Sequence, residues 1–447
     1  MGLLDMIEAA GVVGCGGAGF PTHVKLKGNF EYLIINGAEC EPLLRNDRYL
    51  MRNMAEQIVS TTDLMAKELN IPNAVIALKG HYHEECSALR RAVSDLQANV
   101  RVFELESFYP AGDEQTIVYE VTGRVVPPAA LPSQVGAVVN NVATVYAVCQ
   151  ALSGIPLTHK YLTVTGEVGN PAILHVPVGM GLCECIELAG GAKLDDYVAV
   201  TGGPMMGKVL SKTDAEKAVV TKTTSGILVL PQNSYHGMAQ LADTRRMLMQ
   251  ARSACIQCSN CTQMCPRHLL GHPIEPHRIM RKMAVSIDCR NMLDDKDIRN
   301  ALLCCECGIC ETYACPMGLM PRRINGMLKR ELAQAGIRYQ RTEDRYTPDP
   351  MREYRKAPTE KAASRAGVHK YYDYEIRDLI TAEVQRVDIP LNMHIGAPAE
   401  AVVREGDRVR AGELIAASQQ GKLGANIHAS ISGRVASVGD RITIIKE

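Results

Sequence analysis

Apolar runs and amphipathic stretches alternate along the first third of the chain. Short, mostly apolar runs with the character of buried strands occupy residues 31–36, 73–79 and 100–105. Between them, apolar residues recur at helical spacing over residues 50–70 and 82–97. Strands that alternate with helices favour a mostly parallel sheet, because a helix carries the chain back before each new strand. This part of the chain is therefore predicted to be an α/β domain.

The pattern changes beyond residue 155. Residues 160–168 alternate between polar and apolar side chains, as a half-buried strand does. Short strands, glycines and prolines follow, with one helix near residues 181–189 and another strand from Tyr197. This mixture predicts a small α+β unit.

The second half of the chain divides into a helical, a charged and a glycine-rich part. Residues 240–252 and 274–303 carry helical patterns, whereas residues 339–385 are charged and interrupted by prolines, as in a linker or surface wrap. Short strands and glycines fill the remainder. The predicted boundaries of this multidomain α/β and α+β protein are 1–155, 156–236, 237–338, 339–385 and 386–447.

Charge and composition exclude several classes of protein. Lys and Arg together number 49, as do Asp and Glu, so the net charge is zero and no nucleic-acid partner is expected. No run of about 18 apolar residues is present, so no membrane insertion is expected. The N-terminus lacks the basic and apolar segments of a signal peptide. Sixteen cysteines in such a chain indicate free thiols or clusters in a reducing, cytoplasmic setting.

Two combs of cysteines carry the strongest chemical signal. The first begins at Cys255 and fits the bacterial ferredoxin spacing C-x2-C-x2-C-x3-C-P; the second begins at Cys304 and has one extra residue before its last cysteine. In such a pair, three cysteines of each comb bind one [4Fe–4S] cluster, and the fourth reaches the other cluster. The predicted ligands are Cys255, Cys258, Cys261 and Cys315 for one cluster and Cys304, Cys307, Cys310 and Cys265 for the other.

Cys305 is the spare thiol of the second comb, since using it in place of Cys304 would break the two-residue spacing. Zinc and buried free thiols are the alternatives, but zinc sites use pairs of C-x2-C and not triplets followed by Cys-Pro. Two adjacent clusters conduct electrons and do no bond chemistry alone. The rest of the chain is therefore expected to provide sites for an electron donor and an acceptor.

A glycine-rich loop follows the first short helix, which is predicted over residues 3–10. Gly14, Gly16 and Gly19 satisfy G-x-G-x-x-G, but a helix precedes them where a dinucleotide fingerprint needs a strand. Such a loop can still present backbone N–H groups to a phosphate, with Lys25 adding positive charge. A loop that serves packing alone is an equally good local interpretation.

Polar residues follow the predicted strands at their carboxyl ends, where open α/β sheets bind ligands. Glu39 and Glu41 come just after the first strand, and Asp113 and Glu114 open a later helix. Paired asparagines at 140–141 mark a strand-to-helix turn, where they cap a helix or meet a flavin. A solvated acidic turn and plain capping are the alternatives.

Three segments together are more specific. Gly-Gly-Ala-Gly-Phe-Pro-Thr at residues 16–22, Asn-Gly-Ala-Glu-Cys-Glu-Pro at 36–42 and Val-Asn-Asn-Val-Ala-Thr at 139–144 resemble the Rossmann-like FMN- and NADH-binding domain shared by the flavoprotein subunit of respiratory complex I and the C subunit of the Rnf complex. The resemblance implies FMN contacts from Gly16, Gly17, Asn36, Glu39, Asn140, Asn141 and Thr144, beside the loop glycines Gly14 and Gly19. It implies a nicotinamide nucleotide site with Glu41 and Glu114 as catalytic residues and Lys25 beside them.

The chain departs from complex I at Ala38, where complex I has Asp, and at Cys40, where it has Ser. The first change removes a carboxylate acceptor beside the flavin. Residues 156–236 resemble the soluble-ligand-binding β-grasp domain of the same families, and residues 386–447 resemble the barrel-sandwich hybrid of lipoyl and biotinyl domains. Lys422 lies near the position of a swinging-arm lysine but lacks its usual neighbours, so a structural or docking role is favoured.

The order of the domains, with the barrel last, and the longer second comb resemble the cobalamin reductases of propanediol-utilization bacterial microcompartments. This resemblance implies that NADH reduces FMN, that two [4Fe–4S] clusters carry the electrons, and that cobalamin is the substrate, supplied as cob(I)alamin to a corrinoid adenosyltransferase. It also implies docking to a microcompartment shell protein; a homo-oligomer is left open. The alternatives are an Rnf-type NADH:ferredoxin electron-transfer subunit and a non-enzymatic electron conduit or scaffold.

Overall fold

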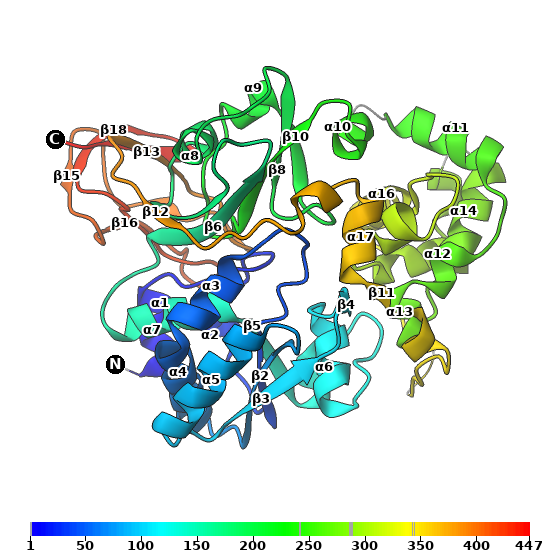
Figure 1. Cartoon of the computed structure of the whole chain (residues 1–447), viewed down its shortest axis with the longest axis horizontal. Coiled ribbons are helices and arrows are strands. Elements are labelled where there is room, and N and C mark those ends of the chain that lie inside the picture. The colour runs from blue at the N-terminus through cyan, green and yellow to red at the C-terminus, as the bar shows by residue number, and fades with distance from the viewer. Residues whose placement is uncertain (1, 241–242, 286–288, 342, 344) are drawn as a thin grey trace.

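The computed structural model describes residues 2–240, 243–285, 289–341, 343 and 345–447. An N-terminal α/β unit, a β-rich unit and a helical unit lie around a central junction, and a C-terminal barrel packs against the β-rich unit on the far side from the helical unit (Figure 1). Within the described residues, no helix is both long and apolar enough to cross a lipid bilayer.

The N-terminal unit is built on a four-stranded parallel sheet in the order β3-β2-β1-β5. Its strands are β1 (Tyr32–Asn36), β2 (Asn73–Lys79), β3 (Val100–Leu105) and β5 (Ala137–Asn141). Tyr32 pairs with Asn73 on one side and Ala137 on the other, so the strands are in register. Because all four run the same way, their carboxyl ends share one edge of the sheet.

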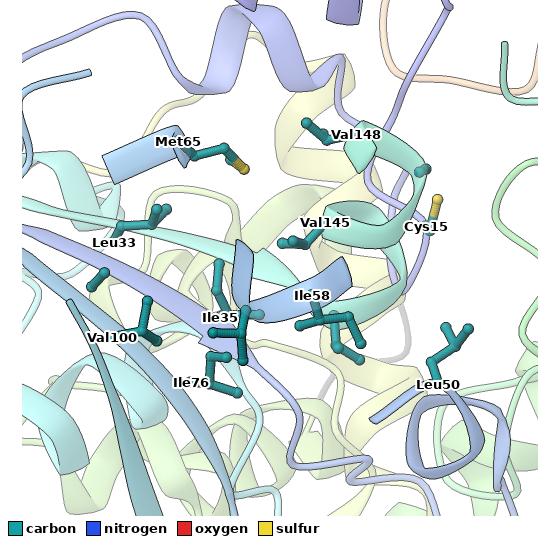
Figure 2. Packing of buried hydrophobic residues seen from close by; sticks show 14 of the residues in the cluster. Cys15, Leu33, Ile35, Leu50, Ile58, Met65, Ile76, Val100, Val145 and Val148 are labelled. Carbon is teal, nitrogen blue, oxygen red and sulfur yellow. The ribbon is translucent and has the colours of Figure 1, made fainter. Parts of the chain in front are cut away.

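Helices cover both faces of this sheet. One face packs against α1 (Leu3–Ala9), α3 (Asn46–Asn53), α4 (Ala55–Glu68), α5 (His83–Asp95) and α7 (Val142–Leu152). Figure 2 shows Leu33, Ile35 and Ile76 of the strands packed near Ile58 and Val145 of these helices. The other face is covered by α6 (Glu114–Thr122), which buries Ile117 and Val118.

The prediction of one helix over residues 50–70 is wrong. The chain forms α3 and α4, which are separated at Met54, where the backbone leaves the helical region (φ −124°, ψ 29°). Both helices pack against α5 and α7, but α4 also contacts β2 and β3 of its own sheet, whereas α3 contacts β6 (His159–Gly166) of the next unit, so the chain turns between them. Both segments carry helical spacing, which is why the apolar pattern did not reveal the break.

The β-rich unit has a six-stranded sheet in the order β12-β7-β6-β10-β8-β9. Its strands are β6 (His159–Gly166), β7 (Ala172–Pro177), β8 (Tyr197–Thr201), β9 (Lys208–Ser211), β10 (Gly226–Pro231) and β12 (Leu379–Thr381), and its helices are α8 (Leu182–Leu188) and α9 (Lys212–Ala215). Its apolar core is continuous with that of the C-terminal barrel.

The helical unit surrounds both cysteine combs. It contains α11 (Thr244–Ala254), α12 (Asn260–Gln263), α13 (Pro266–Leu269), α14 (Pro276–Val285), α15 (Lys296–Arg299) and α16 (Pro321–Gln334), whereas α10 (Tyr235–Gln240) before it packs on β8, β9 and β10 of the β-rich sheet. Met247, Ile279, Met283, Ile324 and Leu328 form its core. Pro266 and Pro321 open helices at the position where a proline's missing N–H costs nothing.

The described part of the segment predicted as a linker contains short helices and strands that join the other units. Its β11 (Ala357–Pro358) pairs with β4 (Phe108–Tyr109), and its β12 pairs with β7. Between them, α17 (Thr359–Arg365) buries Ala362 and Ala363 in an apolar cluster at the central junction. Figure 1 shows this segment crossing from the helical unit to the barrel.

The C-terminal barrel consists of two small sheets, in the orders β13-β19-β18-β15 and β14-β16-β17. The strands are β13 (Arg386–Pro390), β14 (Glu400–Ala401), β15 (Arg408–Val409), β16 (Leu414–Ala417), β17 (Ile427–His428), β18 (Gly433–Val438) and β19 (Arg441–Ile445). Lys422 lies in the loop between β16 and β17, where its amino group donates to Gln419 Oε1 at 2.6 Å.

Candidate functional site

The carboxyl end of β1 opens the candidate flavin site. Asn36 donates from Nδ2 to the Gly112 carbonyl (2.9 Å) and accepts from the Ala38 N–H (3.0 Å). Glu39 adopts a positive φ of 38°, and its Oε1 accepts from the Asp47 N–H at 2.8 Å. Its Oε2 is buried without a hydrogen-bond partner among the described residues. That oxygen is therefore free to bind a ligand group or a water molecule.

The paired asparagines at the end of β5 have different roles. Asn141 caps α7, since its Oδ1 accepts from the Ala143 N–H, and its Nδ2 donates to Asp47 Oδ2 at 2.7 Å. Asn140 is buried, and its Nδ2 has no partner in the described part of the chain. The capping interpretation is therefore correct for Asn141, while Asn140 holds an unused donor at the sheet edge.

The glycine loop lies beside these side chains. A Cβ on Gly16 would lie 2.7 Å from Asn141 Cγ, so the loop touches the end of β5 directly. The Cys15 N–H donates to Thr144 Oγ1 at 2.9 Å, which ties the loop to α7. Gly17 is exposed, and a Cβ there would meet nothing within 4 Å.

These features fit FMN. The open backbone at Gly17 leaves room for a phosphate, and the unpaired groups of Glu39 and Asn140 lie at the same edge of the sheet. Ala38, where complex I has Asp, is fully buried in the apolar cluster under α6. Residue 38 therefore offers a flavin no carboxylate acceptor.

Burial perturbs the acids at this edge. Burial, and then the neighbouring Asp47, raises the pKa of Glu39 to about 7. Burial likewise raises the pKa of Asp47 to about 6. Lys79, at the end of β2, is buried and has its pKa lowered by desolvation; its amino group donates to Thr359 Oγ1 of α17 at 3.0 Å. The carboxyl groups of Glu39 and Asp47 can thus hold a proton near neutral pH.

Of the three residues predicted for the nucleotide site, Lys25 and Glu114 contact each other, but Glu41 has other partners. Lys25 and Glu114 form an ion pair at 2.6 Å, and both are partly exposed. The Glu41 carboxylate instead accepts from the N–H groups of Met205 and Met206, each at 2.8 Å, in the loop after β8. Burial raises the pKa of Glu41 to about 7.

The first cysteine comb surrounds a hollow in the helical unit. Cys255, Cys258, Cys261 and Cys315, the four thiols predicted to share one cluster, all line it. Within the described residues, no group of three or more His, Cys, Asp or Glu side chains is placed to hold a single metal ion. The thiols lie around a space rather than converging on one point, as a multi-iron cluster requires.

The second comb repeats two backbone features of the first, although Asn260–Gln263 then form an α-helix and Ile309–Tyr313 a π-helix. Positive φ angles occur at Gln257 (54°) and Ser259 (64°) in the first comb, and at Glu306 (57°) and Gly308 (83°) in the second. This match equates Cys304 with Cys255 and leaves Cys305 in the place of Ile256. The conformation therefore fits Cys304, Cys307 and Cys310 as ligands, although Cys305 also lies beside Cys307.

The two candidate sites meet at Tyr109, which sequence reasoning missed. Its hydroxyl donates to the Cys307 carbonyl at 2.8 Å and lies 3.4 Å from Glu41 Oε1. Tyr109 and Cys307 share an apolar cluster with Leu43 and Met205. Lys79 was also missed, although it ends a buried strand at the same sheet edge as Asn36. Asp47 carries no local signal, since its role depends on contacts with distant residues.

Four family models match the chain in order. The Nuo51 FMN-binding domain matches residues 7–150, the SLBB domain 161–209, the 4Fe–4S dicluster domain 254–320 and the RnfC barrel sandwich hybrid domain 368–447. The NAD+-reducing [NiFe]-hydrogenase in its H2-reduced state shares the fold, with a TM-score of 0.50 at 18% identity over 76% of this chain and 62% of that chain.

Curated relatives cover nearly all of the chain. Cobalamin reductase PduS of Salmonella typhimurium is 41% identical over 99% of this chain and 96% of its own length, and that of Citrobacter freundii is 40% identical over the same shares. The C subunit of the Na+-translocating ferredoxin:NAD+ oxidoreductase complex of Acetobacterium woodii is 36% identical over 66% of this chain and 62% of its own length. The chain therefore belongs to the PduS family of cobalamin reductases, which shares its domains with the C subunits of Rnf-type complexes.

Proposed function

We propose that this protein is a flavin- and iron–sulfur-dependent NADH oxidoreductase that reduces cob(III)alamin to cob(II)alamin and then to cob(I)alamin. NADH gives up two electrons and one proton as a hydride, and each of the two cobalt steps takes one electron. Near-full-length similarity to cobalamin reductases supports the choice of acceptor. The contact through Tyr109 carries the proposal, because it joins the flavin edge to the second comb within one buried cluster.

The chain provides groups for each cofactor. The backbone at Gly16 and Gly17 would receive the FMN phosphate, and Glu39 and Asn140 would receive polar atoms of its ring system or ribityl chain. Lys25 and Glu114 would bind the nicotinamide nucleotide. When bound, FMN accepts a hydride and releases its electrons singly.

The cysteine ligands complete the proposal. Two [4Fe–4S] clusters are assigned to Cys255, Cys258, Cys261 and Cys315, and to Cys304, Cys307, Cys310 and Cys265. Cys307 shares the apolar cluster of Tyr109, and Cys265 and Cys310 of the same ligand set are also buried, whereas Cys258 of the other set is exposed. The cluster assigned to Cys304, Cys307, Cys310 and Cys265 is thus suited to receive electrons, and the other cluster to pass them on.

The proposal includes a location in the cell and two partner proteins. Cob(I)alamin would be delivered to a corrinoid adenosyltransferase inside a propanediol-utilization microcompartment, with a shell protein as the docking partner. The domain plan and the cobalamin reductase relatives support this placement.

An anaerobic assay tests the function. The protein is loaded with FMN, iron and sulfide, mixed with NADH and hydroxocobalamin, and followed by absorbance. We expect flavin-dependent formation of cob(II)alamin, with protein lacking FMN as the control. Reduction of the clusters without cobalamin reduction would move the acceptor to another protein, as in the Rnf-type alternative. No reduction of flavin or clusters by NADH would favour the conduit or scaffold alternative.

A further inference from the structure

The glycine loop is held by two distant parts of the chain. Lys222, in the loop before β10, is buried and donates from Nζ to the Gly11 carbonyl at 2.7 Å and to the Asn426 carbonyl at 2.6 Å. Gly11 begins the glycine loop, and Asn426 belongs to the C-terminal barrel. One amino group thus joins the N-terminal unit, the β-rich unit and the barrel.

The start of the loop fits tightly under the barrel. Gly11 has a positive φ of 62°, and a Cβ there would lie 2.2 Å from the Asn426 carbonyl oxygen. Asn426 also donates from Nδ2 to the Glu8 carbonyl at 3.3 Å, on the helix that precedes the loop. A side chain larger than hydrogen at residue 11 would therefore push the barrel away.

The far end of the loop is held in the same way. Gly19 has a φ of 74°, and a Cβ there would lie 2.9 Å from Thr223 Cγ2 and 3.0 Å from the Met393 carbonyl oxygen. The Ile395 N–H of the barrel donates to the Gly19 carbonyl at 3.1 Å. Thr223 and Met393 come from the same two units that meet at Lys222.

Between these fixed ends, the middle of the loop is open. Gly16, Gly17 and Ala18 are exposed, and the backbone at Gly17 has free space around it. A loop that presents N–H groups to a phosphate binds it more tightly when its conformation is already set before binding, because less entropy is then lost. The barrel supplies that restraint without touching the phosphate position itself.

We infer that the C-terminal barrel is a positioning clamp for the flavin-binding glycine loop, acting through Lys222 and the Ile395 N–H. The barrel resembles domains that carry lipoyl or biotinyl groups, but its lysine at 422 is bonded to Gln419 on the exposed side. The inference rests on the flavin site of the proposed function and assigns the barrel to FMN binding rather than to carrying a group.

The test compares Lys222→Met with Lys208→Met in the full-length protein. Lys208 is an exposed lysine of the same β-rich unit and serves as the matched control. FMN affinity of the flavin-free protein is measured by quenching of flavin fluorescence, with neither NADH nor cobalamin present. Loss of two hydrogen bonds that order the loop is expected to weaken FMN binding about tenfold in Lys222→Met and not in Lys208→Met. Equal affinity in both variants would overturn the inference.

A second variant covers a folding failure of the first. Ile395→Pro removes the N–H that the barrel donates to Gly19 and leaves Lys222 in place. It is expected to weaken FMN binding severalfold, and wild-type affinity in this variant would also refute the clamp. Hydrogen exchange of residues 11–19 provides a readout without flavin. If the wild-type protein binds no FMN, the proposed function fails, while faster exchange in Lys222→Met would still support the clamp and unchanged exchange would reject it.

Discussion

Glu39→Gln is expected to stabilise the flavin-free protein in mildly alkaline solution and to change it little in acid. Glu39 is buried, its Oε1 accepts one backbone N–H, and its Oε2 has no partner among the described residues. Gln has the shape of the protonated acid, so its oxygen can keep that hydrogen bond while the neutral amide replaces the second oxygen. The substitution therefore removes a buried charge and retains the contacts of the protonated form.

The sign follows from the raised pKa. Burial lifts the pKa of Glu39 from 4.5 to about 7, so the folded protein holds a proton that the unfolded chain has released. The stabilising contribution of that proton is complete below pH 4.5 and is lost as the pH rises through about 7. At about 1.4 kcal/mol per pH unit, the difference of about 2.5 units corresponds to roughly 3 kcal/mol. This is an upper value, because the neighbouring Asp47 also takes up protons as the pair titrates.

Hydrogen exchange of the β1 and β2 amides measures the difference. Because the protein has several units, the opening of this sheet is a better quantity than one unfolding transition. Glu39→Gln should protect these amides more than wild type does at about pH 8, with the gap closing towards about pH 5. Glu68→Gln, at an exposed position of α4, is the control and should leave the protection of these amides unchanged at both pH values. Equal protection of Glu39→Gln and wild type at both pH values would refute the reasoning.

Four further predictions concern the cofactor sites. Cys261→Ala should lose about half of the bound iron and the EPR signal of one cluster, whereas Cys305→Ala should lose neither; loss in the latter would overturn the ligand assignment. Gly16→Ala should lower the stability by about 1–2 kcal/mol in thermal unfolding, because its Cβ would displace the side chain that caps α7. Gly17→Ala should leave the stability unchanged but weaken FMN binding, and equal FMN affinity would remove Gly17 from the site. Lys25→Met should raise the KM for NADH about tenfold, whereas Lys25→Arg should keep the KM closer to that of the wild type. An unchanged KM in Lys25→Met would remove that residue from the nucleotide site.

Local patterns predicted the elements of the N-terminal sheet well. The strands at 73–79 and 100–105 have the predicted bounds, because each is a short apolar run that ends at a polar turn. The same rule of strand ends drew attention to Glu39 and to the asparagines at 140–141, whereas Asn36 was named only by the family resemblance. The cysteine spacing located the thiols that line the hollow of the first comb, since that spacing is itself the geometry of the site.

Contacts between distant residues could not be predicted in this way. The partners of Glu41 lie in the loop after β8, and a local acidic turn gives no sign of them. Lys222 appears in sequence as an ordinary lysine between threonines, and its burial depends on a carbonyl of the barrel more than two hundred residues away. The charges of residues 339–385 suggested a solvated segment, yet α17 buries two alanines at the central junction. Composition averages over a segment and does not show which of its faces is covered.

The segment that contains β11, α17 and β12 also constrains how the protein is made. Strand β12 covers β7 at the edge of the six-stranded sheet of the β-rich unit, but it follows β7 by about two hundred residues in the chain. During synthesis from the N-terminus, that edge therefore stays unpaired until residues 379–381 have left the ribosome. The glycine loop likewise lacks the contacts that hold it until the barrel has been synthesised. The N-terminal α/β unit thus reaches its final form only after the barrel has been made, and a chain that stops before β12 would present an open strand edge to its neighbours.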